Sequence, residues 1–166
     1  MKKIPALLAL LAALPLASAS VTHAANLIDL SVIDRHNGQS LEVYRHRGQF
    51  YVVGTPGHRY AVRLRNKTGA RVMTVLSVDG INALSGETAA TPQTGYVLDA
   101  WQSAEIDGWR KSLDDVAAFY FTSIEDSYAG RTDRPQNVGV IGVAVYRDTD
   151  GGGWRRLAIH RHADYP

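Results

Sequence analysis

Short runs of alternating apolar and polar residues fill most of this 166-residue chain, and turn-forming residues separate them. In residues 60–65, Tyr60, Val62 and Leu64 would fall on one side of an extended chain and Arg63 and Arg65 on the other. Gly, Pro, Asn and Asp recur between such runs. Short strands at this spacing predict an all-β chain, folded as an antiparallel sandwich or barrel. We expect a single antiparallel β-sandwich, jelly-roll-like or Ig-like.

The same pattern gives the expected elements. Two Asp-Gly pairs, Asp79-Gly80 and Asp107-Gly108, predict tight turns because this pair readily takes positive dihedrals. Residues 137–146, NVGVIGVAVY, are apolar on both faces and predict a central strand covered on both sides. Residues 85–94 predict a surface loop, and 126–131 a single helical turn. Strands are expected at 27–33, 41–45, 50–53, 60–65, 71–78, 95–98, 104–106, 116–122, 137–146 and 154–160.

The N-terminus predicts export. Lys2 and Lys3 precede an apolar run, and small residues follow it, which is the order of a Sec-type signal peptide. We expect cleavage after Ala24 or Ala25, with residues 1–25 as the signal peptide and 26–166 as one domain. The apolar run is too short for a membrane span. Since the chain has no cysteine, it has no lipid-attachment site and no disulfide. A periplasmic or secreted protein that relies on its core is therefore expected.

Charge is distributed unevenly along the chain. Without Lys2 and Lys3, basic and acidic residues are equal in number. Basic residues nevertheless dominate positions 35–71, and acidic residues dominate 79–133. This asymmetry would suit a partner surface, but paired strands from the two halves would also neutralise each other, and we favour neutralisation.

Three long segments carry a resemblance to a known group of proteins. They read RLRNKTGARVMTVLSVDGINALSG, GYVLDAWQSAEIDGWR and VAAFYFTSIEDSYAGRTDRPQNVGVIGVAVY. Together with their spacing, they make residues 60–146 resemble a family of exported bacterial β-sandwich proteins of unassigned function. The resemblance implies the fold and the export route, and no activity.

Motifs for catalysis are scarce, so we expect no catalytic residues and no cofactor. No Gly-x-Ser-x-Gly elbow occurs, and the absence of cysteine excludes thiol chemistry. Carboxylates do gather between Asp99 and Asp115, with Glu105 and Asp107 among them. Because two carboxyls across a cleft can hydrolyse a glycoside, a small hydrolase is the alternative function.

Binding residues of three kinds are candidates. Trp101, Tyr96 and Trp109 lie among acids, as in glycan sites. Trp101 has a polar setting, AWQS, and is the best candidate for an exposed ring, although tryptophan in a small domain is more often buried. Arg63 and Arg65 could form a cationic stripe for an anionic envelope polymer. His160, His162 and Asp164 alternate along an extended segment and could hold copper or zinc. Balanced charge and export argue against nucleic acid.

The sequence therefore predicts an exported, non-catalytic binding or interaction module, with a glycan, another envelope polymer or a protein as its partner. Its expected working surface is either the loops at 85–94 and 99–103 or the arginine stripe. The pattern fixes neither the ligand nor the oligomeric state.

Overall fold

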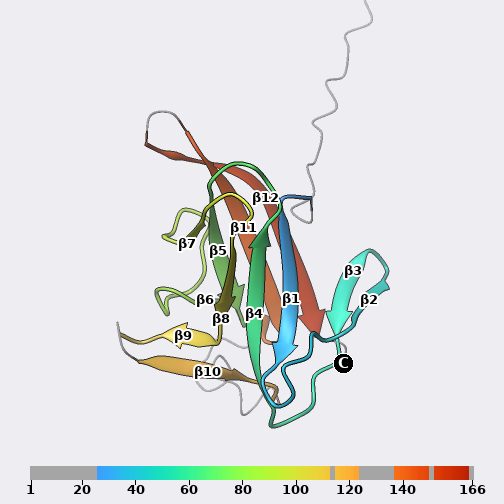
Figure 1. Ribbon diagram of the computed structural model, residues 1–166. Helices are drawn as coiled ribbons and strands as arrows, with labels where there is room; N and C mark the ends of the chain where they lie inside the picture. Colours follow the sequence, from blue (N-terminus) through green and yellow to red (C-terminus); the bar gives the residue numbers. More distant parts are fainter. Residues whose placement is uncertain (1–25, 113–114, 124–136, 150–151, 165–166) are drawn as a thin grey trace, which may run out of the picture.

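The computed structural model describes residues 26–112, 115–123, 137–149 and 152–164, and for 157–164 it describes the backbone alone. These residues form strands, turns and loops without an α-helix. None of them belongs to a helix that is long and apolar enough to cross a membrane. The chain is all-β, as predicted, and the strands form two sheets (Figure 1). The helical turn predicted at 126–131 lies outside the described residues.

The first sheet is antiparallel and has five strands, with the long strand β4 in the middle. Strand β4 pairs with β1 along one side and with β8 and β10 along the other, and β10 pairs in turn with β9. The strands are β1 (Ile28–Asp34), β4 (Arg59–Asn66), β8 (Ser103–Ile106), β9 (Gly108–Arg110) and β10 (Val116–Tyr120).

The second sheet has seven strands, and its main path runs β2-β3-β12-β11-β5-β6, with β7 also paired to β5. All of its pairs are antiparallel except β3 with β12, which is parallel. The strands are β2 (Val43–His46), β3 (Gln49–Val52), β5 (Val72–Val78), β6 (Ile81–Asn82), β7 (Tyr96–Leu98), β11 (Val140–Asp148) and β12 (Trp154–Asp164).

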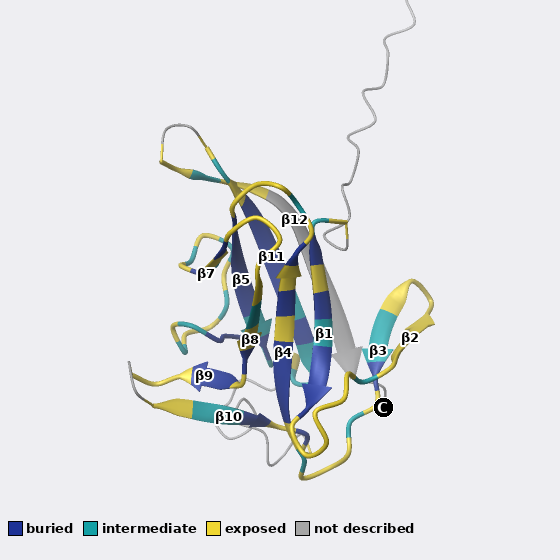
Figure 2. Cartoon of the chain, in the orientation of Figure 1, coloured by how far each residue is buried: buried dark blue, intermediate teal, exposed yellow. Residues whose placement is uncertain are grey.

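Both sheets contribute to one hydrophobic core. Alternate residues of β1 and β4, such as Leu30, Val62 and Leu64, pack with Leu76 and Val143 from the second sheet. Figure 2 shows this alternation as buried and exposed bands along β1 and β4. Burying each such side chain fully contributes about 1.5–3 kcal/mol. The period-2 pattern of the sequence therefore directs one face of β1 and β4 into the shared core.

A second, smaller apolar cluster lies on the other face of β5 and β11. It consists of Met73, Val75, Ala144 and Tyr146, with Trp154 packed against them. Since β5 and β11 also supply the main core, both of their faces are covered. The prediction of a strand buried on both faces within 137–146 is confirmed.

The two Asp-Gly pairs behave differently. Asp79 and Gly80 have φ of 54° and 74° and connect β5 to β6 as a tight hairpin, as predicted. The prediction of a turn at Asp107-Gly108 is wrong, because the chain passes directly from β8 into β9 there. Gly108 instead allows close strand approach, since a Cβ on it would lie 2.1 Å from the Ala117 carbonyl oxygen.

Candidate functional site

The loop predicted at 85–94 is held in place by a single buried side chain. Asn82 is fully buried, and its Nδ2 donates to the Thr94 carbonyl oxygen at 3.2 Å and to Gln93 Oε1 at 3.1 Å. Its Oδ1 accepts the Leu84 N–H at 2.8 Å. One asparagine therefore fixes both ends of the loop, because a buried amide must satisfy its donors and its acceptor.

Gln93 braces the middle of the same loop. Its Oε1 accepts the Ala90 N–H at 2.8 Å, and its Nε2 donates to the Thr88 carbonyl oxygen at 3.0 Å. The loop is thus ordered before any ligand arrives. A surface ordered in advance loses less conformational entropy on binding.

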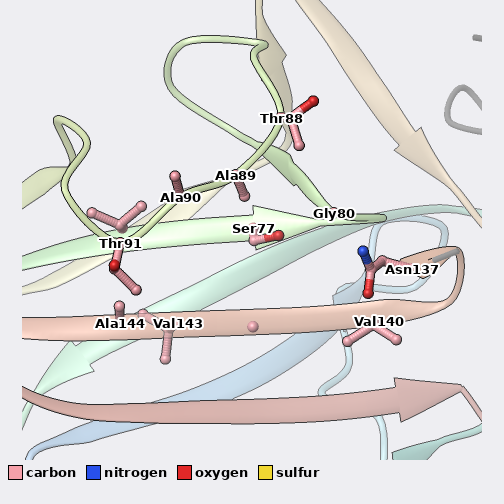
Figure 3. A pocket seen from close by; sticks show the side chains of 12 residues that line it. Ser77, Gly80, Thr88, Ala89, Ala90, Thr91, Asn137, Val140, Val143 and Ala144 are labelled. Carbon is pink, nitrogen blue, oxygen red and sulfur yellow. The ribbon is translucent and has the colours of Figure 1, made fainter. Parts of the chain in front are cut away.

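A hollow of about 170 Å³ lies between this loop and the outer face of β5 and β11 (Figure 3). On the sheet side, Ser77 pairs with Gly142, and these small residues leave a depression between the two strands. On the loop side, residues 88–91 line the hollow. None of the described side chains that line it carries a charge, so this lining suits a neutral group held by packing and a few hydroxyls.

Two further features border the hollow, one at each end. The Tyr146 hydroxyl donates to the Thr91 carbonyl oxygen and joins the loop to β11, and burial raises the pKa of this tyrosine. At the other end, Asn137 lies against Gly80, where a Cβ would come within 2.9 Å of the Asn137 Cβ. Gly80 is therefore required both by its positive φ and by this contact.

The second predicted loop presents Trp101 to solvent. This side chain is 62% exposed, and its backbone has φ of 64°, in the left-handed region that costs a non-glycine residue about 1 kcal/mol or more. Its N–H donates to the Thr68 carbonyl oxygen at 3.2 Å, and its ring lies close to Gly69. The large apolar ring of Trp101 is thus exposed to solvent, and the backbone that carries it is in a strained conformation.

The turn that carries Trp101 is stabilised by another fully buried asparagine. Asn66 Nδ2 donates to the carbonyl oxygens of Asp99 and Ala70, at 2.8 and 2.7 Å. Its Oδ1 accepts the Thr68 N–H at 2.9 Å. The turns at 67–70 and 99–102 are thereby held together, which offsets the strain at Trp101.

The other two predicted aromatic residues do not join Trp101 in one platform. Trp109 is only 7% exposed and meets Phe119 edge to face at a centroid distance of 4.7 Å, so its ring belongs to the core. Tyr96 is half-buried, and burial raises the pKa of its hydroxyl while the neighbouring Arg110 opposes this rise. Of the three, Trp101 offers by far the most surface to a ligand.

The arginine stripe is largely neutralised. Arg63 Nη2 lies 3.0 Å from Glu105 Oε2, and Arg35 Nη1 lies 2.7 Å from Glu105 Oε1. Arg65 is exposed on the same face, opposite Asp29 in β1. Pairing of β4 with β8 therefore brings the basic and acidic halves of the sequence together, which agrees with the neutralisation favoured from the sequence.

Two carboxylates of the alternative hydrolase share an arginine. Glu105 is paired with Arg63 and Arg35, and Asp107 Oδ2 lies 3.8 Å from Arg35 Nη2. Asp99 and Asp115 are bonded through their backbone, since the Asp99 N–H donates to Gln102 Oε1 at 2.7 Å and the Asp115 N–H donates to Ser112 Oγ at 3.1 Å. Ion pairs with arginine thus engage Glu105 and Asp107 together.

The predicted metal ligands lie on one strand. Strand β12 reaches Asp164, with His160 opposite Val143 and His162 opposite Ile141 of β11. Their side chains lie outside the described part of the chain, so metal binding by His160, His162 and Asp164 stays a prediction.

The two buried asparagines that shape these loops are not among the candidate residues named from the sequence. Asn66 is the last residue of β4, and Asn82 is the last residue of β6. That position is the available signal, because an asparagine there can bond the backbone of the following turn.

Comparison with protein-family models, with curated proteins and with solved structures found no match to this chain.

Proposed function

We propose that this chain is an exported β-sandwich and a non-catalytic binding module for a sugar polymer of the cell envelope. Two sheets that share one core support the sandwich. The order of basic, apolar and small residues in 1–25 supports export.

The display of Trp101 is the observation that carries the proposal. A tryptophan that served packing alone would be buried and unstrained, as Trp109 is. Trp101 is instead mostly exposed, on left-handed backbone that Asn66 holds in place. Backbone strain that persists because neighbouring groups enforce it is concentrated at binding and catalytic sites.

A sugar ring fits this surface better than a polyanion does. The face of an indole packs on the apolar face of a pyranose, and polar groups at its edge can bond the hydroxyls. The described residues that line the hollow beside the 85–94 loop are uncharged as well. Arg63, which an anionic polymer would need, is already paired with Glu105.

Binding of neutral polysaccharides and peptidoglycan fragments to the purified chain tests the proposal. In affinity electrophoresis or calorimetry, Trp101→Ala should weaken binding at least tenfold while the melting temperature stays unchanged. Tyr44→Ala is the matched control, because Tyr44 is also an exposed aromatic residue, at 48%, but lies on β2. Full binding by Trp101→Ala, or equal losses in both variants, would refute a sugar site at Trp101.

Export has its own test. Intact-mass measurement of the protein recovered from the cell envelope should give a chain that begins after Ala24 or Ala25. An unprocessed chain retained in the cytoplasm would contradict the proposal.

A further inference from the structure

Asp79 lines a second hollow, at the opposite end of β5 from the Trp101 turn. The hollow measures about 180 Å³ and is walled by the end of β3 and the loop after it, by β10 and by the segment before β11. Three of its lining residues are aromatic, namely Tyr60, Tyr120 and Phe121. Asp79 is the one charged residue among the described residues that line it.

The carboxylate of Asp79 is held but not neutralised. Its Oδ1 accepts the Gly139 N–H at 2.9 Å, and its own N–H donates to the Val140 carbonyl oxygen at 3.0 Å. Among the residues that the structure describes, no Lys, Arg or His forms an ion pair with it. Burial raises its pKa, and the bond from Gly139 only partly offsets that effect.

The turn itself does not need this charge. Asn-Gly forms the same tight hairpin as Asp-Gly, and an asparagine Oδ1 could accept the Gly139 N–H equally well. A half-buried, unpaired carboxylate is costly to keep. A positively charged ligand would pair with the Asp79 carboxylate, whose charge the turn itself does not require.

The exposed aromatic ring in the lining indicates which kind of cation fits. Tyr60 stacks on Phe119 and Phe121, at centroid distances of 5.3 and 4.4 Å, and Gly54 lies against the Phe121 ring, so the two lining rings of Tyr60 and Phe121 are buried and their faces are covered. Tyr120 is 51% exposed and is the lining ring that can offer a face to a ligand. Aromatic faces attract weakly hydrated organic cations. A metal ion would need several oxygen or nitrogen ligands, and the described lining of this hollow has one carboxylate.

We propose that the hollow beside Asp79 binds a small quaternary ammonium group, with Asp79 as its counter-ion and the exposed ring of Tyr120 as its aromatic contact. A primary ammonium fits less well, since it needs three hydrogen-bond acceptors. This site is separate from the sugar surface at Trp101.

Choline and its neutral isostere 3,3-dimethylbutan-1-ol test the charge requirement on the purified chain. Titration followed by NMR or calorimetry should show choline binding at least tenfold tighter than the alcohol. Asp79→Asn should remove that preference while keeping the fold, and Tyr120→Leu should weaken choline binding severalfold. Trp101→Ala should leave choline binding unchanged.

Three results would overturn the proposal: no choline binding, equal binding of choline and the alcohol, or full choline affinity in Asp79→Asn. Because Asp79→Asn keeps the turn and its hydrogen bond, a loss of binding cannot be ascribed to unfolding. A circular-dichroism melt of each variant checks this directly. If the chain binds choline but no sugar, or a sugar but no choline, the two proposed sites are distinguished from each other.

Discussion

Single buried polar residues hold the connections between strands in this molecule. Asn66 bonds the backbone of two turns, Asn82 bonds that of the 85–94 loop, and Asp34 bonds the backbone of the turn at the end of β1. Its Oδ1 accepts the His36 N–H at 2.8 Å, and its Oδ2 accepts from His58 Nδ1 at 2.9 Å. With no cysteine available, such residues constrain loops that a disulfide would otherwise tie.

Asp34 makes the stability of the protein sensitive to acid. The hydrogen bond from His58, followed by that from His36, lowers the pKa of Asp34 below its ordinary value of 3.8. Its stabilising effect is therefore complete above that ordinary value and is lost as the pH falls through the folded-state pKa. Asp34→Asn should lower the melting temperature at neutral pH and leave little difference from the parent at the lowest pH.

Melting temperatures between pH 2 and pH 7 measure this effect. Asp29→Asn is the control, because Asp29 lies on the same strand but is exposed. If Asp29→Asn changed the acid dependence as much as Asp34→Asn, the buried hydrogen bonds would not be its source.

At the scale of elements, the β9–β10 pair depends on a glycine whose role is purely spatial. Gly108 pairs with Ala118, and a Cβ on Gly108 would lie 2.1 Å from the Ala117 carbonyl oxygen. Gly108→Ala should therefore separate the strands and lower the free energy of unfolding by about 3 kcal/mol.

Gly69→Ala is the matched substitution for comparison. A Cβ at Gly69 would meet only the Trp101 ring, at an ordinary 3.9 Å, and its φ is not positive. That variant should be neutral or more stable by about 0.4–1 kcal/mol. Urea unfolding of both proteins provides the measurement, and equal stabilities would show that β9 can move away from β10 at little cost.

Strand positions were predictable from the sequence because alternation and turn chemistry are local. Residues 60–65 and the Asp79-Gly80 turn were correctly predicted for that reason. Pairing was not predictable, since the parallel contact of β3 with β12 joins residues more than 100 positions apart. The Asp107-Gly108 turn was wrongly predicted because a neighbouring strand, and not the dipeptide, sets its backbone.

The candidate site likewise has local features that the sequence predicts and non-local features that it does not. The exposure of Trp101 followed from its polar setting, AWQS, which local sequence reveals. The role of Asp79 did not follow, because its hollow is built from four segments distant in sequence. Local chemistry thus identified a displayed side chain, whereas a cavity required the tertiary structure.

At the scale of the whole molecule, the last strand joins segments from both ends of the chain. Strand β12 pairs with β11 along its length and with β3 in parallel, so it links the β2–β3 hairpin to the rest of the second sheet. Such non-local pairing forms late and slowly, because the entropy cost of closing the long loop precedes the stabilising contacts between the strands. The sheet is therefore complete only when the final strand has been added.

A chain that ends at Gly153 should consequently lose its cooperative unfolding transition. Removal of β12 would expose one edge of β11 and leave β3 paired with β2 alone, and an isolated two-stranded hairpin is at best marginally stable in water. Thermal melts followed by circular dichroism would compare this chain with one that lacks only Tyr165 and Pro166. The longer chain and the full-length protein should both melt cooperatively. A cooperative melt of the shorter chain would mean that the first sheet, β5 and β11 form a stable core without β12.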